Sequence, residues 1–159
     1  AGDTSFEVFI PAVQGDDVAP ETPSLVDIPT GKGQTILVVD DEIGIREVAQ
    51  AVLVKHGYKV MVAEDGPAAL ALLARHSSEI QVLLTDMVMP FMDGVTLVRT
   101  VRKMEPDIKV ILSTGRDEDS RTADVAALHM NGCLTKPYTR ETLLLILDHV
   151  LNTSAALPA

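Results

Sequence analysis

The chain of 159 residues has no tryptophan and only one cysteine, and aromatic residues make up 3% of it. The single cysteine, Cys133, excludes an internal disulfide and is consistent with a reducing cytoplasm. The longest purely apolar stretch, Ala68–Ala74, is much shorter than the roughly 18 residues that a membrane span needs. No signal-peptide pattern opens the sequence. We expect a cytoplasmic segment without direct membrane contact, although its parent protein could be membrane-attached.

Positive charge is also scarce. The 13 lysines and arginines face 23 acids, which gives a net charge of -10 at pH 7. Half of this charge comes from the first 33 residues, which hold six acids and one lysine. Nucleic-acid binding requires a basic face, so this balance argues against a nucleic-acid partner.

Composition divides the chain into four segments. Ser5–Ile10 alternates apolar and polar residues and predicts a short strand closed by Pro11, so residues 1–13 form one piece. Residues 14–33, rich in Asp, Thr, Gly and Pro, predict a flexible linker. Residues 34–152 form the main domain, and residues 153–159 form a short C-terminal tail.

In the main domain, short apolar runs alternate with helical segments. This alternation is typical of a parallel sheet covered on both faces, and it predicts a (βα)5 doubly wound α/β domain. The expected strands are Thr35–Asp40, Lys59–Ala63, Val82–Asp86, Lys109–Ser113 and Gly132–Thr135. The expected helices begin near Ile45, Asp65, Asp93, Glu118 and Thr139, and the fourth ends near Leu128. In the last helix we expect Leu143, Ile146, Leu147 and Val150 to face the core, and Leu144 and Leu145 to lie off that face.

Acidic residues end two of the expected strands, and a lysine ends a third. Asp40 and Asp41 follow ILVV, Asp86 follows LLT, and Lys136 follows CLT. Sites in such sheets lie outside the carboxyl ends of the strands, so we expect these side chains to converge. Three carboxylates raise one another's pKa unless a cation is present, and Mg²⁺ prefers oxygen ligands. The cluster therefore predicts a magnesium site.

The same cluster suits phosphoryl transfer. A carboxylate such as Asp86 can attack phosphorus and form an acyl phosphate. The protein then has to position the group and neutralise its charge, which Mg²⁺, Lys136 and a hydroxyl from Ser113 or Thr114 could do. The alternative is that Asp40 and Asp41 cap a helix, Asp86 ends a turn and Lys136 is an ordinary surface residue. For the cluster to have no functional role, all of these structural explanations would have to be true at the same time.

From Gln34 to Leu151 the sequence resembles the receiver domains of two-component response regulators. The resemblance rests on VVDDE, DMVMPFMDG, STG and NGCLTKP and on their spacing. It implies a flavodoxin-like sheet with strand order 2-1-3-4-5. It also implies roles for individual residues: phosphoacceptor Asp86, metal ligands Asp40, Asp41, Asp86 and the backbone carbonyl of Val88, switch hydroxyl Thr114, and phosphoryl-binding Lys136 before a cis proline.

The function implied by this resemblance is Mg²⁺-dependent transfer of a phosphoryl group from a phosphohistidine to Asp86, followed by conformational signalling to a protein. The implied partner is a histidine kinase or a histidine-phosphotransfer protein. Such a domain catalyses its own phosphorylation and dephosphorylation. The family often has an aromatic switch residue three positions before the lysine, where this chain has Cys133. We expect Cys133 at a half-buried strand position.

The segment GDTSFEVFIPAV has a second, shorter resemblance, to the last strand of a histidine-kinase ATP-binding domain. It implies that the chain is the C-terminal receiver of a hybrid sensor histidine kinase whose catalytic core is absent here. Two other functions remain open. One is a docking module with the receiver fold that signals without phosphorylation. The other is an aspartyl phosphatase, whose general acid would stand where the chain has Val88.

Overall fold

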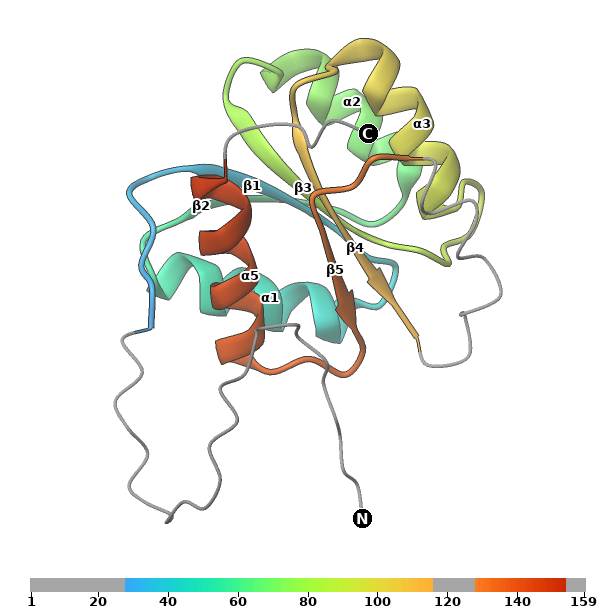
Figure 1. Ribbon diagram of the computed structural model, residues 1–159. Coiled ribbons are helices and arrows are strands. Elements are labelled where there is room, and N and C mark those ends of the chain that lie inside the picture. Colours follow the sequence, from blue (N-terminus) through green and yellow to red (C-terminus); the bar gives the residue numbers. More distant parts are fainter. Residues whose placement is uncertain (1–27, 116–127, 154–159) are drawn as a thin grey trace.

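The computed structural model describes residues 28–115 and 128–153. Strands and helices alternate from β1 to β4, and β5 is the next described element after β4 (Figure 1). The elements are β1 (Thr35–Val39), α1 (Ile43–Lys55), β2 (Lys59–Ala63), α2 (Gly66–His76), β3 (Ile80–Asp86), α3 (Gly94–Met104), β4 (Lys109–Thr114), β5 (Gly132–Thr135) and α5 (Arg140–Asn152). The strand expected at Ser5–Ile10 and nearly all of the helix expected at Glu118–Leu128 lie outside the described residues.

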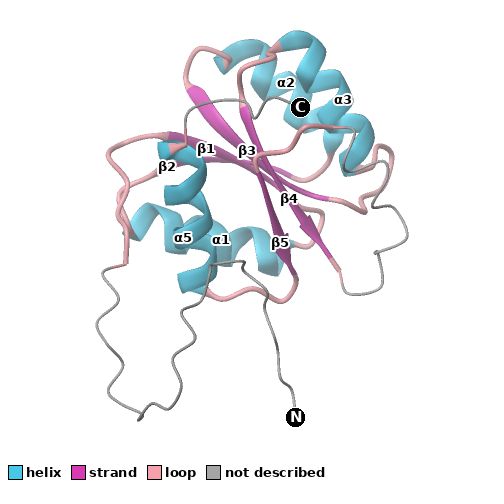
Figure 2. Cartoon of the chain, viewed as in Figure 1, coloured by secondary structure: helices cyan, strands magenta, loops and turns pink. Residues whose placement is uncertain are grey.

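The five strands form one parallel sheet in the order β2-β1-β3-β4-β5, which confirms the predicted fold class and strand order. Helices α1 and α5 pack on one face, and α2 and α3 pack on the other (Figures 1 and 2). Each face has its own hydrophobic cluster. With both faces covered, the central strands can be apolar throughout, as all five residues of β1 are buried.

The helices begin and end where the sequence places cap residues. Asp65, Asp93 and Thr139 are the N-cap residues of α2, α3 and α5, and each side chain accepts a hydrogen bond from a backbone N–H three residues on. Such caps satisfy backbone donors that the helix leaves unpaired. Gly57 follows the end of α1 with φ +92°, a conformation that favours glycine.

Two expectations about packing are wrong. Strand β3 begins at Ile80 rather than Val82, because the register against β1 shifts between Thr35 and Ile36 and brings Ile80 into the sheet. Leu144 was expected off the core face of α5, yet it is fully buried in the cluster between α1, α5 and the sheet. The stripe that α5 buries is therefore wider than the periodic pattern alone suggested.

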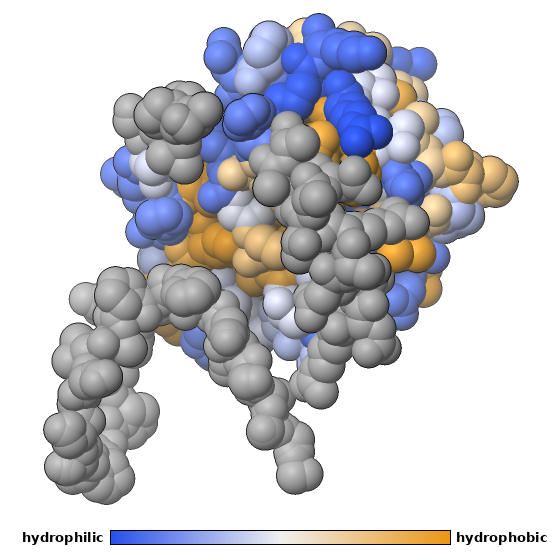
Figure 3. Space-filling view, turned by 45° about the vertical axis from the view of Figure 1, so that its right-hand side comes forward, coloured by the Kyte–Doolittle hydropathy of each residue, from blue (hydrophilic) through white to orange (hydrophobic). Residues whose placement is uncertain are grey.

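The described end of the expected linker is attached to the domain. Gly31 N–H donates to the carbonyl of His56 (2.6 Å), and Gly33 N–H donates to that of Gly57 (2.9 Å). These bonds hold residues 31–33 against the turn between α1 and β2. Among the described helices, none has the length and apolar character needed to cross a membrane. In Figure 3, hydrophilic side chains cover the top of the molecule, where Figure 1 shows α2 and α3, and apolar side chains are visible below them.

Candidate metal and phosphoryl site

The three acids singled out from the sequence converge at one edge of the sheet. Because β1 and β3 are parallel neighbours, their carboxyl ends meet, and ligand oxygens of Asp40, Asp41 and Asp86 all lie within 4.8 Å of one another. Asp40 is 3% exposed and Asp86 is 6% exposed, whereas Asp41 is open to solvent. Two of the three carboxylates therefore lie in a largely dry environment.

Lys136 bridges the two buried carboxylates. Its Nζ lies 2.9 Å from Asp40 Oδ2 and 3.1 Å from Asp86 Oδ2, and 3.8 Å from Glu42 Oε1. The backbone positions it: Lys136 N–H donates to the carbonyl of Thr114 (2.7 Å), and the Lys136–Pro137 peptide is cis, as the family resemblance implied. The lysine therefore reaches the acids from the far side of β4.

The contacts of Asp40 differ from those of a helix cap. The N-cap residue of α1 is Glu42, and no side chain caps this helix. Asp40 Oδ1 accepts the Glu42 N–H (2.9 Å), while Oδ2 faces Lys136. A second cation, Arg46, donates to the main-chain carbonyl of Asp40 (2.6 Å). The sequence analysis missed Arg46, because its partner is a backbone oxygen and no side-chain pattern marks the pair.

The electrostatics of the site follow from this burial. Burial raises the pKa of Asp86 to about 6, and the charge of Asp40 adds to the rise, although Lys136 and a hydrogen bond from the Val88 backbone oppose it. Burial by itself would lower the pKa of Lys136, but its bonds to Asp40 and Asp86 outweigh that and raise it. The pocket thus holds an ammonium group beside a carboxylate that is costly to keep charged.

The loop after Asp86 is closed tightly. Met87 N–H donates to the carbonyl of Ser113 (2.9 Å), and Gly94 N–H donates to the carbonyl of Met87 (2.8 Å). A Cβ at Gly94 would collide with the Asp86 carbonyl and the Met87 backbone, so only glycine permits this approach. The loop therefore returns directly beneath Asp86 and fixes the backbone around the carboxylate.

The two candidate hydroxyls have different surroundings. Ser113 pairs with Asp86 in the sheet register, is 2% exposed, and its Oγ has no hydrogen-bond partner among the described residues. Thr114 is half-buried, and its hydroxyl donates to the thiol of Cys133. Cys133 is exposed rather than half-buried as expected, because its side of β5 is turned outward.

The donor set suits a hard divalent cation. All three candidate side-chain ligands offer carboxylate oxygens, which Mg²⁺ prefers, and one or two carboxylates are enough to hold it. Because Asp86 is buried, its negative charge is poorly solvated, and a bound cation would offset that cost. The residues present therefore fit a Mg²⁺ ion.

Comparisons with known proteins agree with this geometry. The response regulator receiver domain pattern matches residues 36–148. The sensor kinase CckA of Brucella abortus is 32% identical over 94% of this chain, which spans 16% of the kinase. The chemotaxis protein CheY of Bacillus subtilis is 27% identical over 74% of the chain and 97% of that protein. The solved chemotaxis protein CheY4 of Vibrio cholerae superposes with a TM-score of 0.69 at 32% identity, over 74% of this chain and 98% of that one. The family pattern covers well over half of the 159 residues, and the chain therefore belongs to the response regulator receiver domain family.

Proposed function

We propose that this receiver domain accepts a phosphoryl group on Asp86 from a phosphohistidine, with Mg²⁺ bound at Asp40, Asp41, Asp86 and the Val88 carbonyl. The observation that carries the proposal is the buried bridge of Lys136 between Asp40 and Asp86, beside the third acid. An ammonium group held between an acceptor carboxylate and a metal-binding acid is already placed for an incoming phosphoryl group.

The chemical step is an exchange of one bond to phosphorus for another. A carboxylate oxygen of Asp86 attacks the phosphorus, the P–N bond to the imidazole breaks, and the imidazole takes up a proton. The product is an acyl phosphate on Asp86. Water later attacks this acyl phosphate, releases inorganic phosphate and restores the carboxylate. Asp86 must be ionised to attack; burial opposes this ionisation, and a bound cation would favour it.

Each neighbouring residue has a distinct task. Lys136 exchanges its contact with the Asp86 carboxylate for a phosphoryl oxygen and keeps its contact with Asp40. Thr114 exchanges its bond to Cys133 for another phosphoryl oxygen, and this movement starts the conformational signal. Bound Mg²⁺ would supply positive charge that stabilises the transferring group.

The partner and the parent protein form part of the same proposal. The donor is a histidine kinase or a histidine-phosphotransfer protein, because a phosphohistidine must be presented to Asp86. The match to a sensor kinase over almost the whole chain supports a hybrid kinase as parent, with residues 1–13 as the end of its ATP-binding domain and residues 14–33 as a linker. The receiver domain would occupy residues 34–152 and would lie in the cytoplasm.

Intact-mass measurement with acetyl phosphate tests the proposed reaction. We expect one added phosphoryl group in Mg²⁺ and none in EDTA. Asp86→Asn should abolish the adduct, whereas Asp107→Asn, at an exposed acid in the loop between α3 and β4, should leave it unchanged. If the unaltered chain gains no adduct while a control receiver is labelled, phosphorylation-independent docking becomes the better account.

A further inference from the structure

Phe91 is the most exposed large hydrophobic residue that the structure describes, at 88%. It lies in the loop between β3 and α3 with φ +68°, a region that residues other than glycine rarely adopt. The Met92 N–H donates to the Pro90 carbonyl (2.7 Å), which makes Phe91 the centre of a γ-turn. Turns of this kind with positive φ are rare and strained.

Three methionines anchor the same loop to the domain. Met87 and Met89 are 1% and 7% exposed, and Met92 packs against the core and against Gly66. The bond between Gly94 and Met87 closes the base of the loop. The exposure of Phe91 therefore does not come from a loosely held segment. A strained turn on a fixed base keeps an aromatic ring in water, and both features cost stability.

The position of the loop indicates what the ring could contact. The loop starts at Asp86 and runs to α3 at Gly94, so it forms part of the rim that surrounds the Asp86 carboxylate. Val88 in the same loop is 53% exposed and adds apolar surface. A groove of about 660 Å³, lined by Glu42, Lys136 and apolar residues of α1 and α5, leads away from the acids. The acid pocket thus has apolar surface on more than one side.

We propose that Phe91 is a specificity residue: its ring inserts into an apolar recess beside the phosphohistidine of the donor protein and determines which donor phosphorylates Asp86. This inference rests on the proposed function and adds the chemistry of the partner. A small phosphodonor can reach Asp86 without contacting Phe91, whereas a protein donor presents a surface that extends beyond the carboxylate onto this rim. An exposed aromatic anchor at the centre of an interface is a common source of binding energy.

The test compares a protein donor with a small one. Donors are purified histidine-phosphotransfer proteins carrying ³²P on histidine, and the one that labels the unaltered chain fastest is used. Phe91→Asn keeps a side chain that tolerates positive φ. We expect its labelling by the protein to fall about tenfold or more relative to its labelling by acetyl phosphate. Val54→Ser removes another exposed apolar side chain, 56% exposed near the far end of α1, and should leave that ratio unchanged.

Four results would overturn the inference. The first is an unchanged ratio for Phe91→Asn, and the second is no labelling by any protein donor when acetyl phosphate labels the chain. The third is a dimer of the unaltered chain that Phe91→Asn dissociates, which would assign the ring to a second copy. The fourth is an unfolding midpoint that falls much further for Phe91→Asn than for Val54→Ser, since asparagine tolerates the positive φ and should be strongly destabilising only if the ring packs internally. Failure of the proposed function itself would be distinct, because acetyl phosphate would then not label the unaltered chain.

Discussion

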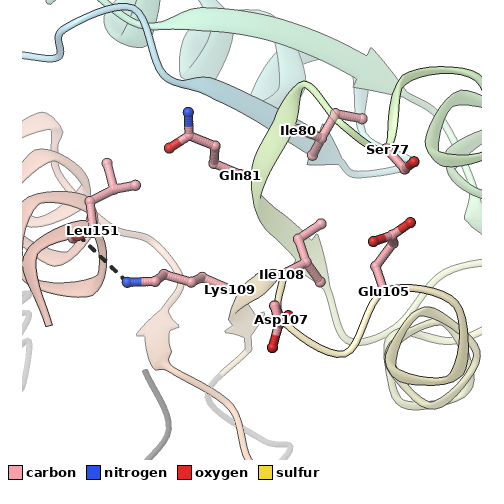
Figure 4. Close-up of a pocket in the computed structure, with 8 residues that line it drawn as sticks. All are labelled: Ser77, Ile80, Gln81, Glu105, Asp107, Ile108, Lys109 and Leu151. Atoms are coloured by element: carbon pink, nitrogen blue, oxygen red, sulfur yellow. Dashed lines mark hydrogen bonds between the residues drawn. The ribbon is translucent and has the colours of Figure 1, made fainter. Parts of the chain in front are cut away.

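The two ends of the sheet both hold a partly buried lysine, but the partners differ. At the carboxyl end, Lys136 faces the carboxylates of Asp40 and Asp86. At the amino end, Lys109 Nζ donates to the backbone carbonyls of Val150 and Thr153, each at 2.7 Å, and so closes the last turn of α5. Figure 4 shows Lys109 reaching from β4 toward Leu151 across a cavity of about 380 Å³.

Arg102, a second cation at the amino end of the sheet, also bonds mainly to backbone carbonyls. Its guanidinium donates to the carbonyls of Pro106, Ile108 and His129 and to the side chain of Asn131, which joins α3 to the segments before β4 and β5. Burial lowers its pKa, although the charge of Asp107 opposes this. Carbonyls cannot titrate, so the cations of this end stabilise the fold. A buried cation marks a reactive site only where its partners are groups whose charge can change.

The largest predicted effect separates the two lysines. Lys136→Met should slow labelling of Asp86 by about 100- to 1000-fold, because a positive charge at the transferring group is lost. In EDTA it should also lower the free energy of unfolding by about 2–3 kcal/mol, since two buried carboxylates are left unpaired, and Mg²⁺ should restore part of this. Urea unfolding with and without Mg²⁺ measures the second effect. Lys109→Met should lower stability without any Mg²⁺ response, and a similar response in both variants would remove the contrast.

The next prediction concerns Arg102. Arg102→Met should lower the free energy of unfolding by about 1 kcal/mol, because the part-buried carbonyl of Ile108 and two exposed carbonyls lose their donor. Labelling by acetyl phosphate, measured per folded molecule at low temperature, should stay within a factor of two. Loss of labelling in a variant that remains folded would show that the amino end also controls the reaction.

An effect of similar size depends on pH. Since the pKa of Asp86 rises from 3.8 to about 6 in the folded chain, its contribution to stability is complete below pH 3.8 and is lost as the pH rises through 6. Asp86→Asn should therefore be more stable than the unaltered chain at pH 8 in EDTA, by about 1–2 kcal/mol, and the two should converge near pH 4. Urea unfolding at several pH values provides the measurement. A difference that grows toward low pH would contradict the assigned shift.

The smallest predicted effect distinguishes the two hydroxyls. Ser113→Ala should change the free energy of unfolding by no more than about 0.5 kcal/mol, because its hydroxyl has no partner to lose among the described residues. Thr114→Ala should slow labelling or alter the lifetime of the acyl phosphate by about tenfold, since it removes one phosphoryl contact. Time courses with acetyl phosphate compare the two variants. Slower labelling or an altered lifetime in Ser113→Ala, with no change in Thr114→Ala, would assign the switch hydroxyl to Ser113.

The fold could be predicted largely from local patterns. Strand positions followed from apolar runs, and Asp65, Asp93 and Thr139 marked three helix starts. The convergence of Asp40, Asp41, Asp86 and Lys136 could be predicted because parallel strands place their carboxyl ends at one edge. These features depend on hydrophobic periodicity and on sheet topology, and both can be inferred from a single sequence.

Features that depend on tertiary contacts could not be predicted. Arg46 and Arg102 donate to main-chain carbonyls, which have no sequence signature, and one acceptor of Arg102 lies 29 residues away. Leu144 is buried because of how α5 lies on the sheet, not because of its spacing. Phe91 adopts a backbone conformation that its residue type disfavours, so propensity pointed away from it. The roles of Asp86, Thr114 and Val88 remain predictions.

Mapping the phosphoryl group is the most direct test of the central claim. The chain is labelled with acetyl phosphate in Mg²⁺, the acyl phosphate is reduced with borohydride, and peptide masses locate the resulting homoserine. We predict homoserine at position 86 alone, and none when Mg²⁺ is removed. Homoserine at position 40 or 41, or a phosphoryl group found on a histidine instead, would contradict Asp86 as the acceptor.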